Sequence, residues 1–207
     1  MLYIFSYSLT PLKEATLSQS VSFEQNSDMT KPKSYLVISA LGQDHPGIVD
    51  NLSKIILEYG CNITESRMTV LGGEFAIMIM VEGNWNTLTK LEDAIPGLQD
   101  QLDLTIIVKR TSDRTKGPDL LPYAVEVVCM DHPGIVHSLA GFFSSRQINI
   151  EDMATSSYAA AHTGTSMFSV HITVGIPSGM HIASLREEFL EFCDSLNLDA
   201  VLEPVKI

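Results

Sequence analysis

The sequence predicts an α+β protein that contains two tandem copies of one β-α-β-β-α-β unit. The hexapeptide DHPGIV occurs at residues 44–49 and again at 131–136, which is an offset of 87 residues. The same offset places the Asn-Ile pair of residues 62–63 onto the Asn-Ile pair of residues 149–150. Each hexapeptide follows an apolar run of strand length and precedes apolar residues at helical spacing. An internal duplication is the simplest explanation of these repeats.

The first copy is expected to begin with the apolar strand Tyr35–Leu41. After the motif, apolar residues at helical spacing predict a helix that ends near Gly60, because glycine adopts the left-handed conformation that terminates helices. A hairpin follows, with the dipeptide Gly72-Gly73 as its turn. A second amphipathic helix and a closing strand complete the unit, so that its later elements are strands 62–71 and 74–82, a helix over 85–98 and a strand over 103–109.

The second copy repeats this order with larger apolar residues on its first helix and a longer hairpin turn, around residues 160–164. Its strands are expected at 123–130, 149–159, 165–176 and 198–205, and its helices at 135–143 and 182–196. The order β-α-β-β-α-β is that of the ferredoxin-like fold, in which two helices cover one face of a four-stranded antiparallel sheet.

These elements divide the chain into an N-terminal extension over 1–33, a first domain over 34–110, a linker over 111–121 and a second domain over 122–207. The linker assignment is based on its Asp, Arg, Lys, Gly and Pro content. The extension has a short apolar patch at Leu2–Phe5 but neither the basic start nor the long apolar region of a signal peptide. An upstream start codon and a disordered arm both remain open as explanations of it.

Composition disfavours several classes of function. The formal net charge of -12, from 13 basic and 25 acidic residues, opposes direct contact with a nucleic-acid backbone. No apolar stretch approaches the roughly 20 residues that a membrane-spanning helix needs. The three cysteines, Cys61, Cys129 and Cys193, are widely spaced, which fits neither a disulfide framework nor a metal or redox site. We therefore expect a cytoplasmic protein with reduced thiols and no bound metal.

The repeated motif suits the start of a helix that receives a ligand. Proline has a φ suited to the first helical turn, and the glycine after it removes a side chain that would block approach to the backbone. The free N–H groups and the positive end of the helix dipole favour a carboxylate. Asp44 and Asp131 would then cap the helix or bind an ammonium group. The alternative is that each motif is only a strand-to-helix turn.

Asn62 and Asn149 begin the strand that follows the first helix of each unit. We expect this position to lie close to the motif loop, so that the side-chain amides are available to a ligand. Alternatively, the two asparagines satisfy the turn after the helix. His45 and His132 are treated as solvated loop residues.

A strand, the DHPGIV motif, an amphipathic helix and a following Asn-Ile pair together resemble the ACT domain, a regulatory module that binds amino acids. The resemblance covers about residues 34–207. It implies a ligand held between the first loop of one unit and the facing strand of another. The residues implied in binding are Asp44, His45, Pro46, Gly47, Ile48, Val49, Asn62 and Ile63 of the first copy, and Asp131, His132, Pro133, Gly134, Ile135, Val136, Asn149 and Ile150 of the second.

The stretches SYLVISALGQDHPGIV and GCNITESRMTVLGGEFAIMIM, in a chain of two such units with no attached enzyme, also resemble one bacterial group of ACT regulators. This resemblance implies a cytoplasmic protein that responds to a small amino acid, glycine, without a cofactor. It also implies repression of glycine-cleavage genes through contact with a transcription activator protein rather than with DNA, and a homodimer is compatible with it. The second hairpin, Ser156–Thr163, departs from the first copy and leaves open whether both sites bind.

Three other functions compete with this interpretation. An enzyme is disfavoured, because the sequence has no phosphate-binding loop, dinucleotide fingerprint, HExxH or GxSxG motif. An RNA-binding domain of the same topology would present aromatic and basic residues on its sheet, whereas Glu74–Glu82 has one Phe and no Lys or Arg. A stand-alone ACT sensor that regulates a metabolic enzyme allosterically differs from the repressor only in its partner.

Overall fold

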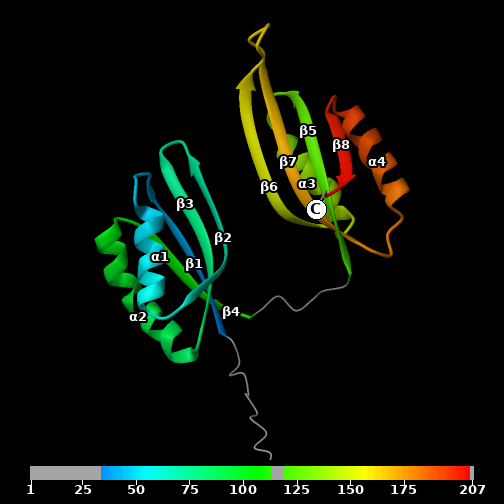
Figure 1. Ribbon diagram of the computed structural model, residues 1–207. Helices are drawn as coiled ribbons and strands as arrows, with labels where there is room; N and C mark the ends of the chain where they lie inside the picture. The colour runs from blue at the N-terminus through cyan, green and yellow to red at the C-terminus, as the bar shows by residue number, and fades with distance from the viewer. Residues whose placement is uncertain (1–33, 113–118, 206–207) are drawn as a thin grey trace, which may run out of the picture. The chain divides into compact units, whose positions relative to one another are not determined.

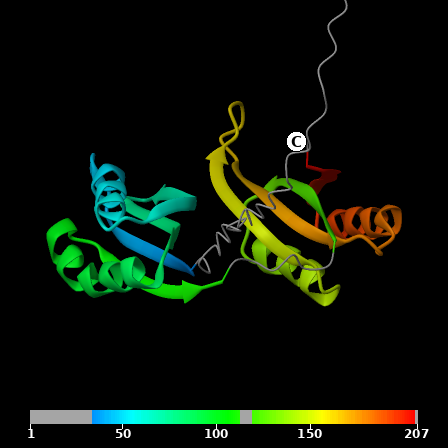
Figure 2. The ribbon, with the colours of Figure 1, turned by 60° about the horizontal axis from the view of Figure 1, so that its bottom comes forward.

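The computed structural model describes residues 34–112 and 119–205, and the chain divides into two compact units between Thr111 and Ser112. Each unit is a four-stranded antiparallel sheet with two helices on one of its faces (Figures 1 and 2). The extension expected over 1–33 and residues 113–118 of the expected linker lie outside the described residues. The α+β class and the two ferredoxin-like units are thus confirmed.

The first unit has its strands in the spatial order β2-β3-β1-β4. Its elements are β1 (Ser34–Gln43), α1 (Ile48–Glu58), β2 (Asn62–Leu71), β3 (Glu74–Gly83), α2 (Trp85–Leu102) and β4 (Thr105–Thr111). The second unit has the corresponding order β6-β7-β5-β8. Its elements are β5 (Leu120–Met130), α3 (Ile135–Ser145), β6 (Asn149–Ala159), β7 (Ser166–Pro177), α4 (Ile182–Ser195) and β8 (Asp199–Pro204).

Two strands extend further toward the expected linker than the sequence indicated. β4 continues to Thr111 instead of ending at Lys109, and β5 begins at Leu120 instead of Tyr123. Pro122 suggested a linker because it cannot donate a backbone hydrogen bond. Its carbonyl accepts the N–H of Val205, just beyond the end of β8, and a strand residue directs its N and its carbonyl to the same side. The missing donor therefore faces Val205, at the end of the β5–β8 pairing, so only a bond at the end of the ladder is absent.

Each unit has its own core, formed where alternating strand residues meet the apolar stripes of the helices. The first core is mainly aliphatic, with Leu36, Val81 and Leu88 fully buried. The second core adds four phenylalanine rings with neighbouring centroids 5.1 to 5.4 Å apart. These rings come from one face of α3 and one face of α4, namely Phe142, Phe143, Phe189 and Phe192. The two copies thus share a fold while their cores differ in side-chain size.

Replacement of Gly42 by alanine is expected to destabilise the first unit. The added Cβ would lie 2.7 Å from Cδ2 of Leu104 and 2.8 Å from the carbonyl oxygen of Asp103. The second contact is with a backbone atom, which cannot move away as a flexible side chain can. We expect the free energy of unfolding to fall by about 1–3 kcal/mol, the usual cost of overpacking. Urea denaturation measures it. Gly97→Ala is the control, because its Cβ would meet open space on a helix and should stabilise by about 0.5–1 kcal/mol. Equal stability of the two variants would contradict the packing argument.

Burial of the Cys193 thiol is expected to make the protein less stable at alkaline pH. Burial, assisted by Asp194, raises the pKa of this thiol from 9.0 to about 12, since the thiolate loses its hydration. Between these values the unfolded chain binds fewer protons than the folded chain, so the free energy of unfolding falls as pH rises. Below pH 9 the contribution is constant. Urea denaturation from pH 8 to 11 should show a steeper fall for the parent protein than for Cys193→Val. Identical slopes would refute the assignment to this thiol.

Candidate functional site

The two DHPG loops, residues 44–47 and 131–134, connect β1 to α1 and β5 to α3. All eight loop residues are exposed. Each helix begins directly after its glycine, and Gly47 and Gly134 both have a φ of 97°. This conformation is left-handed, which only glycine adopts without strain. The duplicated sequence therefore forms the same backbone turn in both units.

The prolines were expected in the first turn of each helix, and this expectation was wrong. Pro46 and Pro133 precede the N-cap glycines, so neither lies in the first turn of a helix. The glycine is required because the chain must turn from an extended strand into the helix axis, and a positive φ accomplishes this in one residue. Its lack of a side chain also leaves the helix end open, and no atom lies within 4 Å of a Cβ built on Gly134.

The first turns of both helices have unpaired backbone donors. In neither helix does a side chain cap the first turn, and the first bonds are Asn51 N–H to the Gly47 carbonyl and Ser138 N–H to the Gly134 carbonyl, both 2.9 Å. Within the described residues, the three preceding N–H groups of each helix have no protein partner; they belong to residues 48–50 and 135–137. Such groups, with the helix dipole, form an anion-binding position.

The two aspartates do not cap the helices, contrary to one of the expectations. Asp131 Oδ2 instead accepts long hydrogen bonds from the hydroxyls of Ser157 at 3.3 Å and Ser166 at 3.5 Å, on the hairpin of β6 and β7. The 87-residue offset places Val70 where the second unit has Ser157. Within the described residues, the carboxylate of Asp44 has no side-chain hydrogen bond or ion pair. The two loops thus share a backbone but differ in the surroundings of their carboxylates.

The motif histidines are held in the same way in both loops. Nδ1 of His45 donates to the carbonyl of Pro46 at 3.2 Å, and Nδ1 of His132 donates to the carbonyl of Pro133 at 3.1 Å. A carbonyl only accepts, so the proton lies on Nδ1 in this arrangement. Both rings are exposed, in agreement with their interpretation as solvated loop residues.

Asn62 and Asn149 lie far from the DHPG loop of their own unit, so the expected proximity was wrong. The backbone of Asp44 bonds to Gly73, beside the start of β3, whereas Asn62 pairs with Glu82 near its end. Glu82 lies eight positions beyond Glu74 along β3, or about 27 Å at about 3.4 Å per residue. The second unit has the same arrangement, with Asn149 paired with Gly175 at the far end of β7. The cause is the helix, which returns the chain to the end of the sheet where β1 begins.

The remaining motif residues divide between core and surface. The side chains of Ile48 and Ile135 are buried and offer a ligand only their backbone. Val49 is 45% exposed and Ile63 is 37% exposed. Val136 and Ile150 are half-buried. The hydroxyls of Ser157 and Ser166 were missed from the sequence, because the second hairpin departs from the first and no motif marks them.

Comparison with known proteins identifies the class. An ACT-domain family model matches residues 34–109. The glycine cleavage system transcriptional repressor of Escherichia coli (strain K12) is 32% identical over 171 residues, which cover 83% of this chain and 90% of that protein. The protein of the same name from Shigella flexneri gives the same values.

Solved structures agree with the sequence comparison. A crystal structure assigned as a glycine cleavage system transcriptional repressor has a TM-score of 0.66 at 30% identity and covers 84% of this chain and 99% of its own. A protein of unknown function from Galdieria sulphuraria has a TM-score of 0.68 at 26% identity, with the same coverage.

The fold and these matches define a protein with two tandem ACT domains. The chain belongs to the family of the glycine cleavage system transcriptional repressor, and its role is therefore regulatory rather than enzymatic. Within the part of the chain that the structure describes, no helix is long and apolar enough to cross a membrane. The same residues contain no group of three or more His, Cys, Asp or Glu arranged to hold a metal ion.

The positive φ of the loop glycine predicts a ranking of substitutions at Gly134. Alanine is strained at this φ and should lower the free energy of unfolding by about 1–2 kcal/mol. Asparagine tolerates left-handed conformations better and should cost less. Both variants are compared by urea denaturation, and a steric explanation is excluded because the Cβ has open space. An alanine variant as stable as the parent would show that the helix starts without this turn.

Proposed function

We propose that the chain is a regulator that responds to a small amino acid, glycine, through the DHPG loops. The observation that supports this most strongly is the pair of uncapped helix N-termini in exposed loops with identical backbone geometry. Three unpaired N–H groups in each first turn suit the carboxylate that every free amino acid carries. Glycine is proposed because the relative's name refers to glycine cleavage.

The ligand ammonium would be bound by the carboxylate beside each helix. Asp44 and Asp131 are exposed and adjoin the turns that present the N–H groups. An ammonium needs acceptors, which the aspartates offer and the helix terminus does not. In this proposal the loop recognises both charged ends of the amino acid.

Asn62 and Asn149 require a second unit in this proposal. One unit separates its motif loop from its asparagine by about 27 Å, far more than a single amino acid spans. A ligand in contact with both would lie between the loop of one unit and the strand of another. In this proposal a homodimer supplies the second unit, in line with the arrangement that the family resemblance implies.

The regulatory output would be a protein contact in the cytoplasm. The relative is a transcriptional repressor. A net charge of -12 opposes binding to a phosphate backbone. Repression would therefore act through a transcription activator protein, and no cofactor is needed because the signal is carried by binding alone.

Isothermal titration of glycine into the full chain tests the ligand. The affinity must be modest, because about -1.5 kcal/mol per non-hydrogen atom is the ceiling for very small ligands and limits glycine to a Kd of about several µM or weaker. Glycine should release or absorb heat at millimolar concentration, with serine and alanine weaker. The double variant Asp44→Ala/Asp131→Ala should lose at least about ten-fold in affinity, which corresponds to about 1.4 kcal/mol.

Asp93→Ala serves as the matched control, since it removes an exposed carboxylate on α2 that belongs to neither loop. Its affinity for glycine should equal that of the parent. Absence of heat with all three amino acids would exclude direct sensing by the loops. Equal weakening by Asp93→Ala would mean that net charge, and not the loop carboxylates, governs the response.

A further inference from the structure

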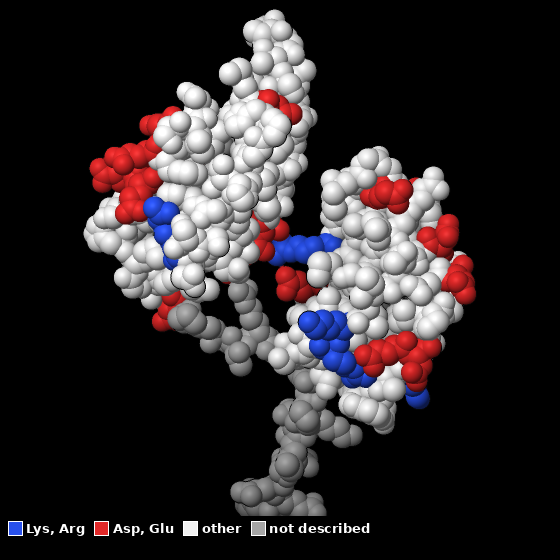
Figure 3. Space-filling view, turned by 180° about the vertical axis from the view of Figure 1, so that it is seen from behind, with Lys and Arg blue, Asp and Glu red and all other residues white. Residues whose placement is uncertain are grey.

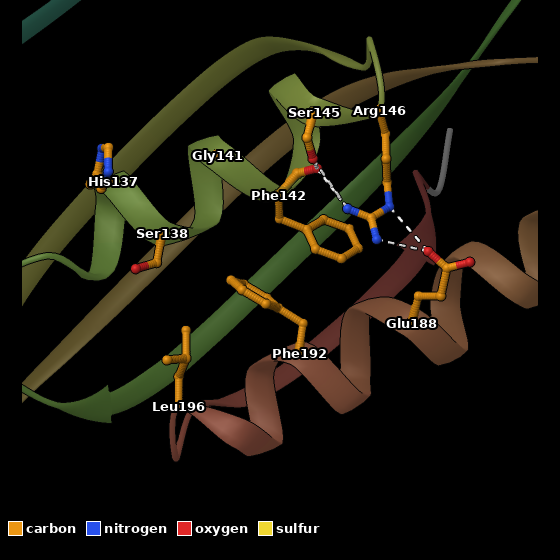
Figure 4. A pocket seen from close by; sticks show the side chains of 9 residues that line it. All are labelled: His137, Ser138, Gly141, Phe142, Ser145, Arg146, Glu188, Phe192 and Leu196. Atoms are coloured by element: carbon orange, nitrogen blue, oxygen red, sulfur yellow. Dashed lines mark hydrogen bonds and ion pairs between the residues drawn. The ribbon is translucent and has the colours of Figure 1, made fainter.

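A groove of about 410 Å³ runs between α3 and α4 on the helix face of the second unit (Figure 4). It does not include the DHPG loop, because its lining on α3 begins at His137, after the motif. Its size is within the range of protein binding pockets, about 300–1,000 Å³. The residues that line it are His137, Ser138, Gly141, Phe142, Ser145, Arg146, Glu188, Phe192 and Leu196.

The floor of the groove is apolar, and the middle of its α3 wall has small side chains. Phe142, Phe192 and Leu196 face the space between the helices (Figure 4). Between His137 and Arg146, which also line the groove, the α3 wall presents the small residues Ser138, Gly141 and Ser145. A Cβ built on Gly141 would meet nothing within 4 Å. These small residues leave room for a second backbone to approach the aromatic floor.

The first unit has larger side chains at the positions that correspond to this wall. The 87-residue offset places Asn51, Lys54 and Glu58 where the second unit has Ser138, Gly141 and Ser145. Lys54 and Glu58 also pair across one helical turn at 4.0 Å. The open wall is therefore a property of the second copy and not of the shared fold.

Arg146 gives the groove no free positive charge for an anion. Its Nη2 and Nε donate to Oε2 of Glu188 at 2.8 and 3.1 Å, and its Nη1 donates to the carbonyl of Phe142 at 3.1 Å. Its Cζ also lies 3.7 Å from the centroid of the Phe142 ring. The guanidinium is thus engaged on its edges and on one face, and an anionic ligand would have to break an ion pair to reach it.

The α4 side of the groove is acidic. Glu188 forms the edge and is 54% exposed, and Glu187, Glu191 and Asp194 continue outward on the same helix, all exposed. Glu188 and Glu191 are three residues apart, so they lie on neighbouring positions of one flank. Figure 3 shows acidic side chains gathered over α4 on this face. Among the described residues, the last three acids have no side-chain ion pair.

We propose that the groove binds an amphipathic basic helix of a partner protein. Apolar residues of that helix would occupy the floor over Phe142 and Phe192, and its Lys and Arg residues would lie along Glu187, Glu188 and Glu191. Helix-in-groove recognition uses this combination of an apolar stripe and a charged flank. If the partner is the transcription activator, that identity rests on the proposed function. Binding of a basic helix to the groove does not depend on glycine and can be tested separately.

The probe for the test is a fluorescein-labelled peptide of about 18 residues, long enough to form a helix on binding. It consists of leucine and lysine, with leucine at i, i+3, i+4 and i+7. A scrambled isomer with the same composition is the control for charge alone. Fluorescence anisotropy with the full chain should show at least about ten-fold tighter binding of the amphipathic peptide than of the scrambled one.

Gly141→Gln is expected to weaken peptide binding at least about ten-fold by filling the open wall. The variant should fold, because glutamine is favoured over glycine in a helix by roughly 0.5–1 kcal/mol and its Cβ would meet no atom within 4 Å. Gly97→Gln, on α2 of the first unit, is the matched control and should bind as the parent does.

The acidic flank is tested with Glu187→Gln/Glu191→Gln against Asp93→Asn/Asp100→Asn, which changes the net charge equally on exposed positions of α2. Only the first pair should weaken the peptide. Equal effects of the two pairs, or equal binding of the scrambled peptide, would overturn the proposal. A dimer of the parent that dissociates in Gly141→Gln during sedimentation would identify a second copy as the occupant and would also overturn it.

Discussion

Between β1 and α1 the chain must change from an extended strand to a helix within four residues, and Gly47 achieves this with a φ of 97°. Gly134 repeats the same turn in the second unit. The turn directs each helix across its own sheet, so that apolar side chains reach the core. It also leaves the helix N-terminus exposed and without a side-chain cap. Stability and the capacity to bind an anion therefore depend on the same backbone conformation.

The path of α1 has a further effect on the candidate site. Because the helix carries the chain back along the sheet, β2 begins at the end opposite the DHPG loop. Asn62 is thus separated from the loop of its own unit, although both belong to the repeated pattern. Contact of one ligand with both elements requires two units. Ligand binding would then be coupled to association by mass action, which is a simple physical basis for regulation.

The two units show how a duplicated fold acquires different surfaces. Both retain the turn, the helix stripe and the strand order, because these are needed to bury a core. Outside that requirement they diverge. Asp131 accepts hydrogen bonds from two serine hydroxyls, whereas Asp44 accepts none within the described residues. The flank of α3 has small residues where α1 has an ion pair. The fold alone does not determine what each unit binds.

The local structure of this protein was determined largely by its sequence. The strand from Asn62 to Leu71 and its Gly72 turn were predicted correctly. Strand patterns of apolar residues, the helical spacing of apolar residues and glycines at turns are all properties of neighbouring residues in the chain. The strand start at Leu120 was not predicted, since Pro122 argued against a strand and is tolerated here because it lies at the end of the β5–β8 pairing.

Only the tertiary structure decided which distant residues share a site. It placed Asn62 and Asn149 away from the loops, brought Ser157 and Ser166 to Asp131, and joined Arg146 to Glu188 across two helices. Such contacts depend on strand register and helix packing. No repeat or motif along the chain records them, because they arise between segments that are brought together only when the core is buried.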